Sequence, residues 1–221
     1  MKNARAVAAG VEAELHVGYA PSLTASFLPQ ALRAFHDVMP KVRVRLHDCS
    51  TAEMLAGLRE AKLELAFTVR VGPGLLRRFQ FAELRRDPIC LAAALNHRLA
   101  RKRTVTLQEA ALEPLITYSR KDYPDAHQFV TNLFARMKSK PAIAEEHDSV
   151  SSLIAAVEAG NGVAVATRSL ECISGLRLKL IPISPAPEPL IIGAAWIGQK
   201  LSPSAEQFLD CAKQLDSKMN R

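Results

Sequence analysis

Hydroxyl side chains stand where predicted strands give way to predicted helices. Ser22 follows the alternating stretch ELHVGYA at 14–20, and Ser50 and Thr51 follow KVRVRLHD at 41–48. We predict that Ser22 and Ser50 are helix N-caps, because a serine oxygen accepts a hydrogen bond from the N–H groups at a helix start. Glu53, three residues after Ser50, completes the pattern of a capping box.

Two later segments repeat this arrangement, DSVSS at 148–152 and TYSRKDYPD at 117–125. A helix N-terminus has N–H groups without intrahelical partners and a partial positive charge, so it favours anions. A hydroxyl can donate to a carboxylate without adding charge of its own. Each residue taken alone is also explained as a plain cap worth about 1 kcal/mol. The four junctions together indicate a site for a small organic anion.

The sequence patterns of common catalytic sites are absent. No HExxH, GxSxG, Walker loop or GxGxxG occurs. The six histidines are dispersed, and a metal site built on His127 and His147 is a minor alternative. Glu145 and Glu146 are interpreted as a solvated end of a strand or helix. We therefore expect no enzyme activity, no metal and no cofactor.

Composition indicates a globular protein of the α/β class. The chain has 221 residues, of which 48% are hydrophobic and 23% charged. No run of 18 apolar residues occurs, so a membrane span is not expected. The N-terminal segment lacks the long apolar core of a secretion signal. Four widely spaced cysteines fit buried, reduced thiols in a cytoplasmic protein: Cys49, Cys90, Cys172 and Cys211.

Basic residues exceed acidic ones, giving a formal net charge of +7. The main clusters are Arg77–Arg78, Arg85–Arg86 and Arg101–Arg103. They are scattered, and aromatic residues make up only 5% of the chain. Direct nucleic-acid binding by this chain is therefore only weakly supported.

The first ninety residues predict alternating strands and helices. Strands are expected at 14–20, 41–48 and 63–69, with a helix after each of the first two. Pro29 lies inside the first helical pattern, so that helix either starts irregularly or bends. The third strand is nearly all apolar and is expected at the centre of a sheet. This order predicts right-handed parallel crossovers.

The remainder continues the alternation. We expect helices at about 124–137, 149–159 and 204–218, and strands at about 142–145, 162–167 and 190–198. A new apolar run begins at RRDPICLAAAL, and the proline-rich segment 182–190 is expected to be a loop or crossover.

At these residues the chain resembles the effector-binding domain of LysR-type transcriptional regulators. The stretch LHVGYAPSLTASFLPQALRAFHDVMPKVRVRLHDCSTAEMLAGLREAKLELAF is similar to the first part of that domain. AALNHRLARKRTVTLQEAALEPLITYSR and SVSSLIAAVEAGNGVAVATRSL resemble its second half. Three residues depart from the usual pattern in loops and edges: Glu64, Arg98 and Thr167.

The resemblance implies an α/β fold with two Rossmann-like lobes joined by two crossover strands, like a type 2 periplasmic binding protein. Residues 13–86 would form lobe one, 87–182 lobe two, and 183–221 the return to lobe one. The segment MKNARAVAAGVE, at 1–12, resembles the tail of a linker helix. Family members normally carry a winged helix-turn-helix before that linker, so the sequence reads as a shortened form or fragment of a regulator.

The resemblance also implies an effector in the cleft between the lobes. Residues at matching positions of lobe one are Ser22, Leu23, Ser50 and Thr51, with Val69 and Arg70 near the hinge. Those of lobe two are Ser119, Arg120, Ser149 and Val150. Arg70 could hold a carboxylate through two hydrogen bonds, or it could simply be solvated.

We therefore expect an effector-sensing domain that binds a small organic anion, an aromatic acid or a muconate-like metabolite, as in regulators of aromatic-compound breakdown. The family implies a homodimer through lobe-one helices and edge strands, and a tetramer in the full-length regulator. DNA would be contacted only through a winged helix-turn-helix, and no membrane partner is expected. The alternatives are a solute-binding protein of a transport system and an enzyme on a related two-lobed scaffold.

Overall fold

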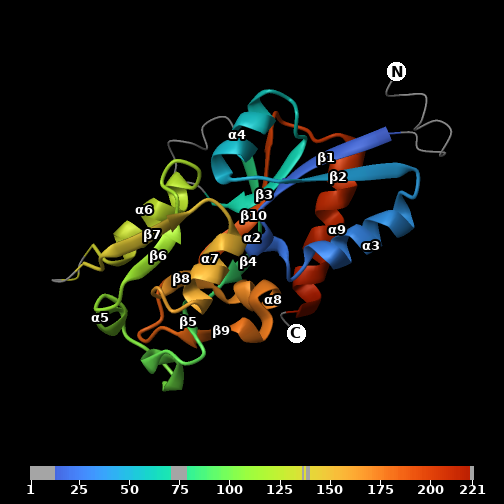
Figure 1. Cartoon of the computed structure of the whole chain (residues 1–221). Helices are drawn as coiled ribbons and strands as arrows, with labels where there is room; N and C mark the ends of the chain where they lie inside the picture. Colours follow the sequence, from blue (N-terminus) through green and yellow to red (C-terminus); the bar gives the residue numbers. More distant parts are fainter. Residues whose placement is uncertain (1–12, 71–78, 136, 138–139, 220–221) are drawn as a thin grey trace. The chain divides into compact units, whose positions relative to one another are not determined.

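The computed structural model describes residues 13–70, 79–135, 137 and 140–219 (Figure 1). The chain divides into two compact units. One holds the described residues up to Arg85 and from Ile191 onward, and the other holds Arg86–Leu190. The sequence suggested a return to the first unit at 183, but Ile183 packs in the core of the second unit and forms a bridge with Val105. The expected linker-helix tail at 1–12 lies outside the described residues.

The first unit is built on a five-stranded sheet of order β2-β1-β3-β10-β4. Its strands are β1 (Ala13–Tyr19), β2 (Val42–Asp48), β3 (Leu65–Val69), β4 (Phe79–Asp87) and β10 (Leu190–Ile197). β1 pairs in parallel with both β2 and β3, whereas β10 is antiparallel to β3. The predicted parallel crossovers and the central place of β3, all of whose residues are buried, are confirmed.

Helices cover both faces of this sheet, because side chains of a strand alternate between its faces. α3 (Leu28–Val38) and α9 (Pro203–Met219) pack with Leu15, Val17 and Phe67 in one apolar cluster. α4 (Thr51–Arg59) packs with Ala66 and Ala195 in another. The core of the unit thus lies on both sides of β1, β3 and β10.

Proline decides how the first helical segment begins. The structure has a short helix α2 (Pro21–Thr24) followed by α3, and Pro29 lies in the first turn of α3. A proline is tolerated there, since the first N–H groups of a helix have no intrahelical acceptor. The expected irregular start is therefore a break into two helices.

The second unit contains two smaller sheets. β8 (Ala164–Thr167), β5 (Ile89–Ala94) and β9 (Leu178–Pro182) pair antiparallel in that order, and β6 (Leu115–Tyr118) pairs in parallel with β7 (Ile143–His147). Its α-helices are α5 (Leu107–Ala110), α6 (Pro124–Leu133), α7 (Val150–Glu158) and α8 (Glu171–Ser174). Short 3-10 helices are η2 (Arg98–Arg101), η3 (Arg168–Leu170) and η4 (Gly175–Arg177).

Several expectations for these elements need correction. α6 ends at Leu133 rather than near 137, and none of its residues is buried, so little packing extends it. Strands β4, β6 and β9 were not predicted. β4 lies at the edge of its sheet, where its polar side chains reach solvent and obscure the apolar pattern. Leu46, an apolar residue of the edge strand β2, is 36% exposed.

The prediction that the cysteines are buried is correct for two of the four. Cys90 and Cys211 are buried, but Cys49 is partly exposed and Cys172 is exposed on α8. All four cysteines are free.

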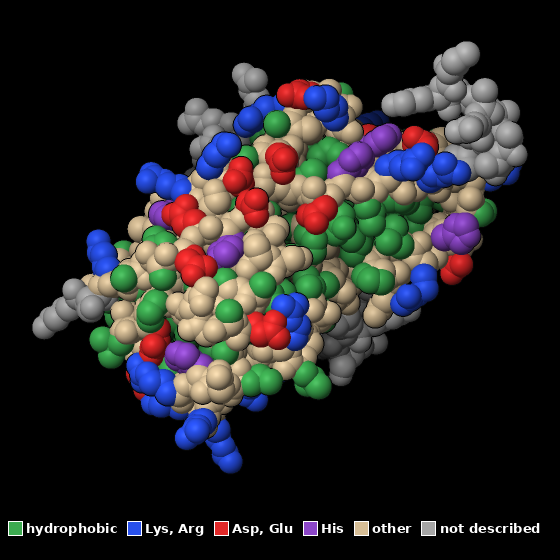
Figure 2. Space-filling model, in the orientation of Figure 1, with side chains coloured by type: hydrophobic (Ala, Val, Ile, Leu, Met, Phe, Trp, Pro, Cys, Tyr) green, Lys and Arg blue, Asp and Glu red, His purple; other side chains and the backbone are tan. Residues whose placement is uncertain are grey.

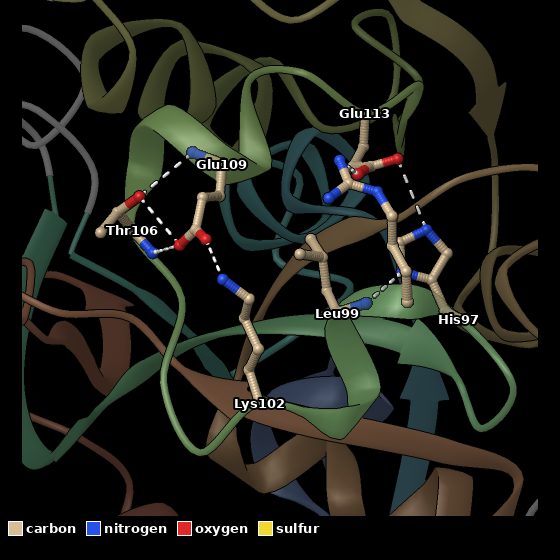
Figure 3. Close-up of polar contacts among 7 residues, drawn as sticks. His97, Leu99, Lys102, Thr106, Glu109 and Glu113 are labelled. Carbon is tan, nitrogen blue, oxygen red and sulfur yellow. Dashed lines mark hydrogen bonds and ion pairs between the residues drawn. The ribbon is translucent and has the colours of Figure 1, made fainter.

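Two polar clusters brace the loop between β5 and α5 (Figure 3). Thr106 caps α5 through a capping box with Glu109, which also pairs with Lys102. In the second cluster, His97 Nδ1 accepts the Leu99 backbone N–H at 3.2 Å, and its Nε2 lies 3.5 Å from Glu113. These polar side chains therefore fix the conformation of this loop. They do not belong to the predicted effector site.

Candidate functional site

The carboxyl ends of β1, β2 and β3 meet at one edge of the first unit's sheet. Tyr19, the last residue of β1, pairs with Asp48 of β2 and with Phe67 of β3. The N–H of Cys49 donates to the carbonyl of Tyr19 at 3.0 Å, which ties the segment after β2 to β1. Three pairs of predicted site residues lie at or just after these strand ends: Ser22 and Leu23, Ser50 and Thr51, and Val69 and Arg70.

Ser50 is the N-cap of α4, and the predicted capping box is confirmed. Its hydroxyl accepts from the Glu53 N–H at 3.3 Å and donates to Glu53 Oε2 at 2.9 Å. The backbone N–H of Ser50 donates to the same oxygen at 2.8 Å. The hydroxyl proton is therefore engaged within the protein. What remains for a ligand is the first turn of α4, whose N–H groups have no acceptor in their own helix.

Ser22 is not an N-cap, which corrects the prediction. α2 begins at Pro21, its N-cap is Ala20, and no side chain caps it. Proline supplies the fixed backbone angle that starts the turn, so a capping serine is not required. Thr24 closes this turn instead, since its buried hydroxyl donates to the carbonyl of Ala20 at 3.0 Å. Leu23 packs against apolar clusters on both faces of the sheet.

Arg70 already has a carboxylate partner. Its Nη2 donates to Glu83 at 3.1 Å, and its guanidinium lies 5.3 Å from the centre of the Phe81 ring. Its backbone N–H donates to Ile191 at 2.8 Å and continues the pairing of β3 with β10. With 47% of its side chain exposed, Arg70 keeps further N–H donors available to solvent.

The edge of β2 carries acidic groups beside the hydroxyls. Burial raises the pKa of the Asp48 carboxyl, and the nearby Glu53 carboxylate raises it further. Burial likewise raises the pKa of the Cys49 thiol, with contributions from Glu53 and Asp48. Burial and the charge of Asp48 raise the pKa of Tyr19. The start of α4 contributes positive potential at this edge through its helix dipole.

The second unit has a corresponding edge where β6 and β7 end, because Tyr118 pairs with His147. The Ser119 N–H donates to the carbonyl of His147 at 2.8 Å, and its hydroxyl donates to Asp122 at 3.0 Å. The Arg120 N–H donates to Glu146 at 3.4 Å. The partners Asp122 and Glu146 were missed. The Ser-x-x-Asp spacing of 119–122 was the available signal for Asp122, since it repeats the spacing of a capping box.

The predicted hydroxyl-bearing helix start within 117–125 is wrong. α6 begins at Pro124 after Tyr123, and no side chain caps it. Tyr123 instead packs its ring 4.6 Å from that of Tyr118 and donates to the carbonyl of Asp148 at 3.3 Å. Proline again starts the helix without a cap, so Ser119 is free of that role and is held by Asp122.

Ser149 caps α7, as predicted. Its oxygen accepts from the Ser152 N–H at 3.2 Å, and the two hydroxyl oxygens are 2.9 Å apart. Val150 is the first residue of α7 and is 9% exposed. The serine is again committed to the helix start, and the first-turn N–H groups of α7 again have no acceptor in their own helix.

The histidines considered for a metal have separate carboxylate neighbours. His127 lies 3.9 Å from Glu146, and His147 lies 3.0 Å from Glu145. Within the part of the chain that the structure describes, no group of three or more His, Cys, Asp and Glu side chains could hold a metal ion. In the same part, no helix combines the length and the apolar character needed to cross a bilayer.

Comparisons with known proteins agree with this fold. The HTH-type transcriptional regulator TtuA of Agrobacterium vitis is 25% identical over 211 residues, which are 94% of this chain and 68% of TtuA. Across TtuA and two further regulators, the chain spans 52% to 68% of the relative's length.

Two solved structures share the architecture at lower identity. The effector binding domain of QuiR in complex with shikimate has a TM-score of 0.81 and 19% identity, with 93% of this chain and 97% of that chain covered. The effector binding domain of BenM with benzoate has a TM-score of 0.81 and 20% identity, with 95% of each chain covered.

The family follows from a match over nearly the whole chain. The model of the LysR substrate binding domain matches residues 8–217. This confirms the resemblance drawn from the sequence and the fold of the type 2 periplasmic-binding-protein kind. The chain therefore belongs to the LysR substrate binding domain family.

Proposed function

We propose that this domain senses a small organic anion and thereby controls DNA binding by a LysR-type regulator. The observation that carries the proposal is the start of α4, placed by its capping box at the edge where β1, β2 and β3 end. In parallel sheets, ligands bind beyond the carboxyl ends of the strands. In the second unit, the start of α7 is capped by Ser149 and has the same kind of first-turn N–H groups.

In this proposal the backbone, more than the serine hydroxyls, binds the anion. Ser50 and Ser119 donate their hydroxyl protons to Glu53 and Asp122, so these side chains orient the turns. Helix N–H groups and the helix dipole then stabilise a carboxylate. Thr51 and Val150 begin the two helices and stay in the proposed site, together with Leu23, Val69, Arg70 and Arg120. Ser22 also stays, as a residue of α2 rather than as a cap.

The class of effector is a carboxylic acid, with an aromatic or muconate-like acid as the finer proposal. Shikimate and benzoate, the compounds bound to the QuiR and BenM domains, both carry one carboxylate on a six-membered ring. The matched relatives are regulators, which favours effector sensing over transport and over catalysis. We place the domain in the cytoplasm and assign DNA contact to a winged helix-turn-helix of the whole regulator.

Homodimerisation through the first unit is part of the proposal, with a tetramer for the whole regulator. Apolar side chains gather between β2 and α3 (Figure 2), where a groove is lined by Leu32, Phe35, His36, Pro40, Val42, Arg43 and Val44. Val38 and Leu46 beside it are 58% and 36% exposed. β2 is also an edge strand, whose unpaired backbone groups are suited to contact with a second copy.

A thermal-shift screen against small carboxylic acids tests the effector proposal. Shikimate, benzoate and muconate are included, with uncharged benzyl alcohol as the control for binding by the ring alone. We expect at least one acid to raise the melting temperature, because a ligand that binds only the folded state stabilises it. A folded domain that no acid in a broad panel stabilises would contradict the proposal.

A further inference from the structure

Thr68, in the central strand β3, carries a buried hydroxyl without a hydrogen-bond partner among the described residues. The residue is 1% exposed. Such groups are rare, because burial removes the hydrogen bonds that water supplied. Valine has nearly the same shape, suits a strand as well and lacks this cost. Stability of the fold therefore gives no reason for a hydroxyl at this position.

A second buried threonine shows what a structural hydroxyl looks like in this domain. Thr24 is fully buried, and its hydroxyl donates to the carbonyl of Ala20 at 3.0 Å. Thr24 thus completes the α2 turn. Thr68 has no equivalent acceptor in the described part of the chain, so the two buried threonines differ in what their hydroxyls do.

Thr68 lies close to the edge of the proposed effector site. It is the residue before Val69, where β3 ends. Side chains alternate along a strand, so Thr68 faces the same side as Ala66, which packs with Met54 of α4. α4 begins at Thr51, one turn before Met54, at the edge toward which β3 runs.

The neighbour of Thr68 across the sheet leaves room for an aromatic ring. Thr68 pairs with Gly193, and a Cβ on Gly193 would lie only 2.5 Å from the Phe81 ring. The ring therefore occupies the space beside Thr68. Phe81 is itself half-buried and carries Arg70 over its face. An apolar ring therefore lies next to the residue that pairs with Thr68.

We propose that Thr68 determines effector specificity, with its hydroxyl donating to an oxygen atom of the bound acid. The inference rests on the proposed effector function. An oxygen atom of the ligand would accept a hydrogen bond from the buried hydroxyl. The same ligand would pack against the Phe81 ring. An effector that offers no oxygen to Thr68 leaves the hydroxyl unsatisfied and binds more weakly.

Two isosteric variants test the ligand-free part of the proposal. Thr68→Val is expected to unfold at the same urea concentration as the wild type or a higher one, because it removes an unsatisfied polar group. Thr24→Val is the matched control and is expected to unfold at a lower concentration, since it removes the buried hydrogen bond from the Thr24 hydroxyl to the Ala20 carbonyl. A Thr68→Val midpoint lowered as much as that of Thr24→Val overturns the proposal, because the hydroxyl would then have a structural role.

Calorimetry with shikimate and benzoate tests the ligand-dependent part. For an acid that binds the wild type, we expect Thr68→Val to weaken binding about tenfold or more and Thr68→Ser to preserve affinity within about threefold. Wild-type binding that Thr68→Val leaves unchanged overturns the Thr68 assignment and leaves the effector function standing. If the wild type binds neither these acids nor any other in the screen, the effector function fails and the assignment fails with it.

Discussion

The Ser50 and Glu53 side chains satisfy each other at the start of α4. Glu53 Oε2 accepts the Ser50 backbone N–H at 2.8 Å and its hydroxyl at 2.9 Å, while the Ser50 oxygen accepts the Glu53 N–H at 3.3 Å. The pair ties the end of β2 to the first turn of α4. The sequence suggested that Ser50 contacts a ligand, but in the structure its side chain fixes the geometry of the helix start.

Replacement of Ser50 by alanine is expected to lower the free energy of unfolding by about 1 kcal/mol, because the N-cap is lost. Urea unfolding followed by circular dichroism measures this change. Ser22→Ala is the matched control, since Ser22 caps no helix, and its effect should stay within about 0.5 kcal/mol. Equal effects of the two variants would contradict the assignment of the caps.

Replacement of Thr51 by valine is expected to weaken effector binding about tenfold. Hydrogen bonds to charged groups contribute about 1.5–3 kcal/mol, and valine keeps the shape of threonine. Calorimetry with an acid identified by the screen provides the measurement. Thr104→Val, at an exposed loop position, should bind as the wild type does. Unchanged affinity in Thr51→Val would remove Thr51 from the site.

Replacement of Lys102 by methionine is expected to raise the pKa of Glu109. Hydrogen bonds from Lys102, and then from Thr106, lower this pKa from 4.5 to about 2 (Figure 3). A lowered carboxyl pKa stabilises the folded state above pH 4.5, and this contribution is lost as the pH falls toward 2. The stability difference between wild type and Lys102→Met should therefore shrink over that range.

Carbon chemical shifts of the Glu109 side chain, followed by NMR across the same pH range, report its titration directly. A wild-type Glu109 that titrates near its ordinary value of 4.5 would show that Lys102 does not hold it. Lys121→Met, at an exposed position in the loop after β6, controls for the loss of one positive charge.

Replacement of Gly193 by alanine is expected to destabilise the first unit by about 3 kcal/mol, as overpacking does when backbone must move. An added Cβ would lie 2.2 Å from the Ala82 carbonyl oxygen and 2.5 Å from the Phe81 ring. Gly198→Ala is the control, because a Cβ there has open space and only the positive φ of 88° is strained. Its expected cost is about 1 kcal/mol. Denaturant unfolding in which Gly193→Ala costs no more than Gly198→Ala would contradict this packing.

Replacement of Leu46 by glutamate is expected to convert a dimer into a monomer, because it places a charge on the exposed edge strand beside the apolar groove. Light scattering at tens of micromolar, roughly where a dimer with a Kd near 1 μM is assembled, gives the mass. Leu112→Glu controls for a charge at another exposed leucine. A wild-type domain that is monomeric at this concentration would reject the dimer for the isolated domain.

The sequence predicted the elements whose signals are local and strong. The alternation in 41–48 and the apolar run in 63–69 identified β2 and β3, and the Ser50–Glu53 spacing identified the start of α4. These signals depend on strand periodicity and on hydrogen bonds between residues three positions apart, so a single sequence carries them. The order of strands and helices, together with the family resemblance, was sufficient for the fold class.

Tertiary structure decided what the short-range patterns left open. Prolines, not Ser22 or Ser119, start the turns after β1 and before α6, and Asp122 holds Ser119. The edge strand β4 escaped prediction because its polar residues reach solvent. The unpartnered hydroxyl of Thr68 became visible only once β3 lay between β1 and β10, since burial and the lack of an acceptor depend on neighbours far apart in the chain. Sequence thus determined which segments form the sheet edge, and packing determined which side chains there remain available to a ligand.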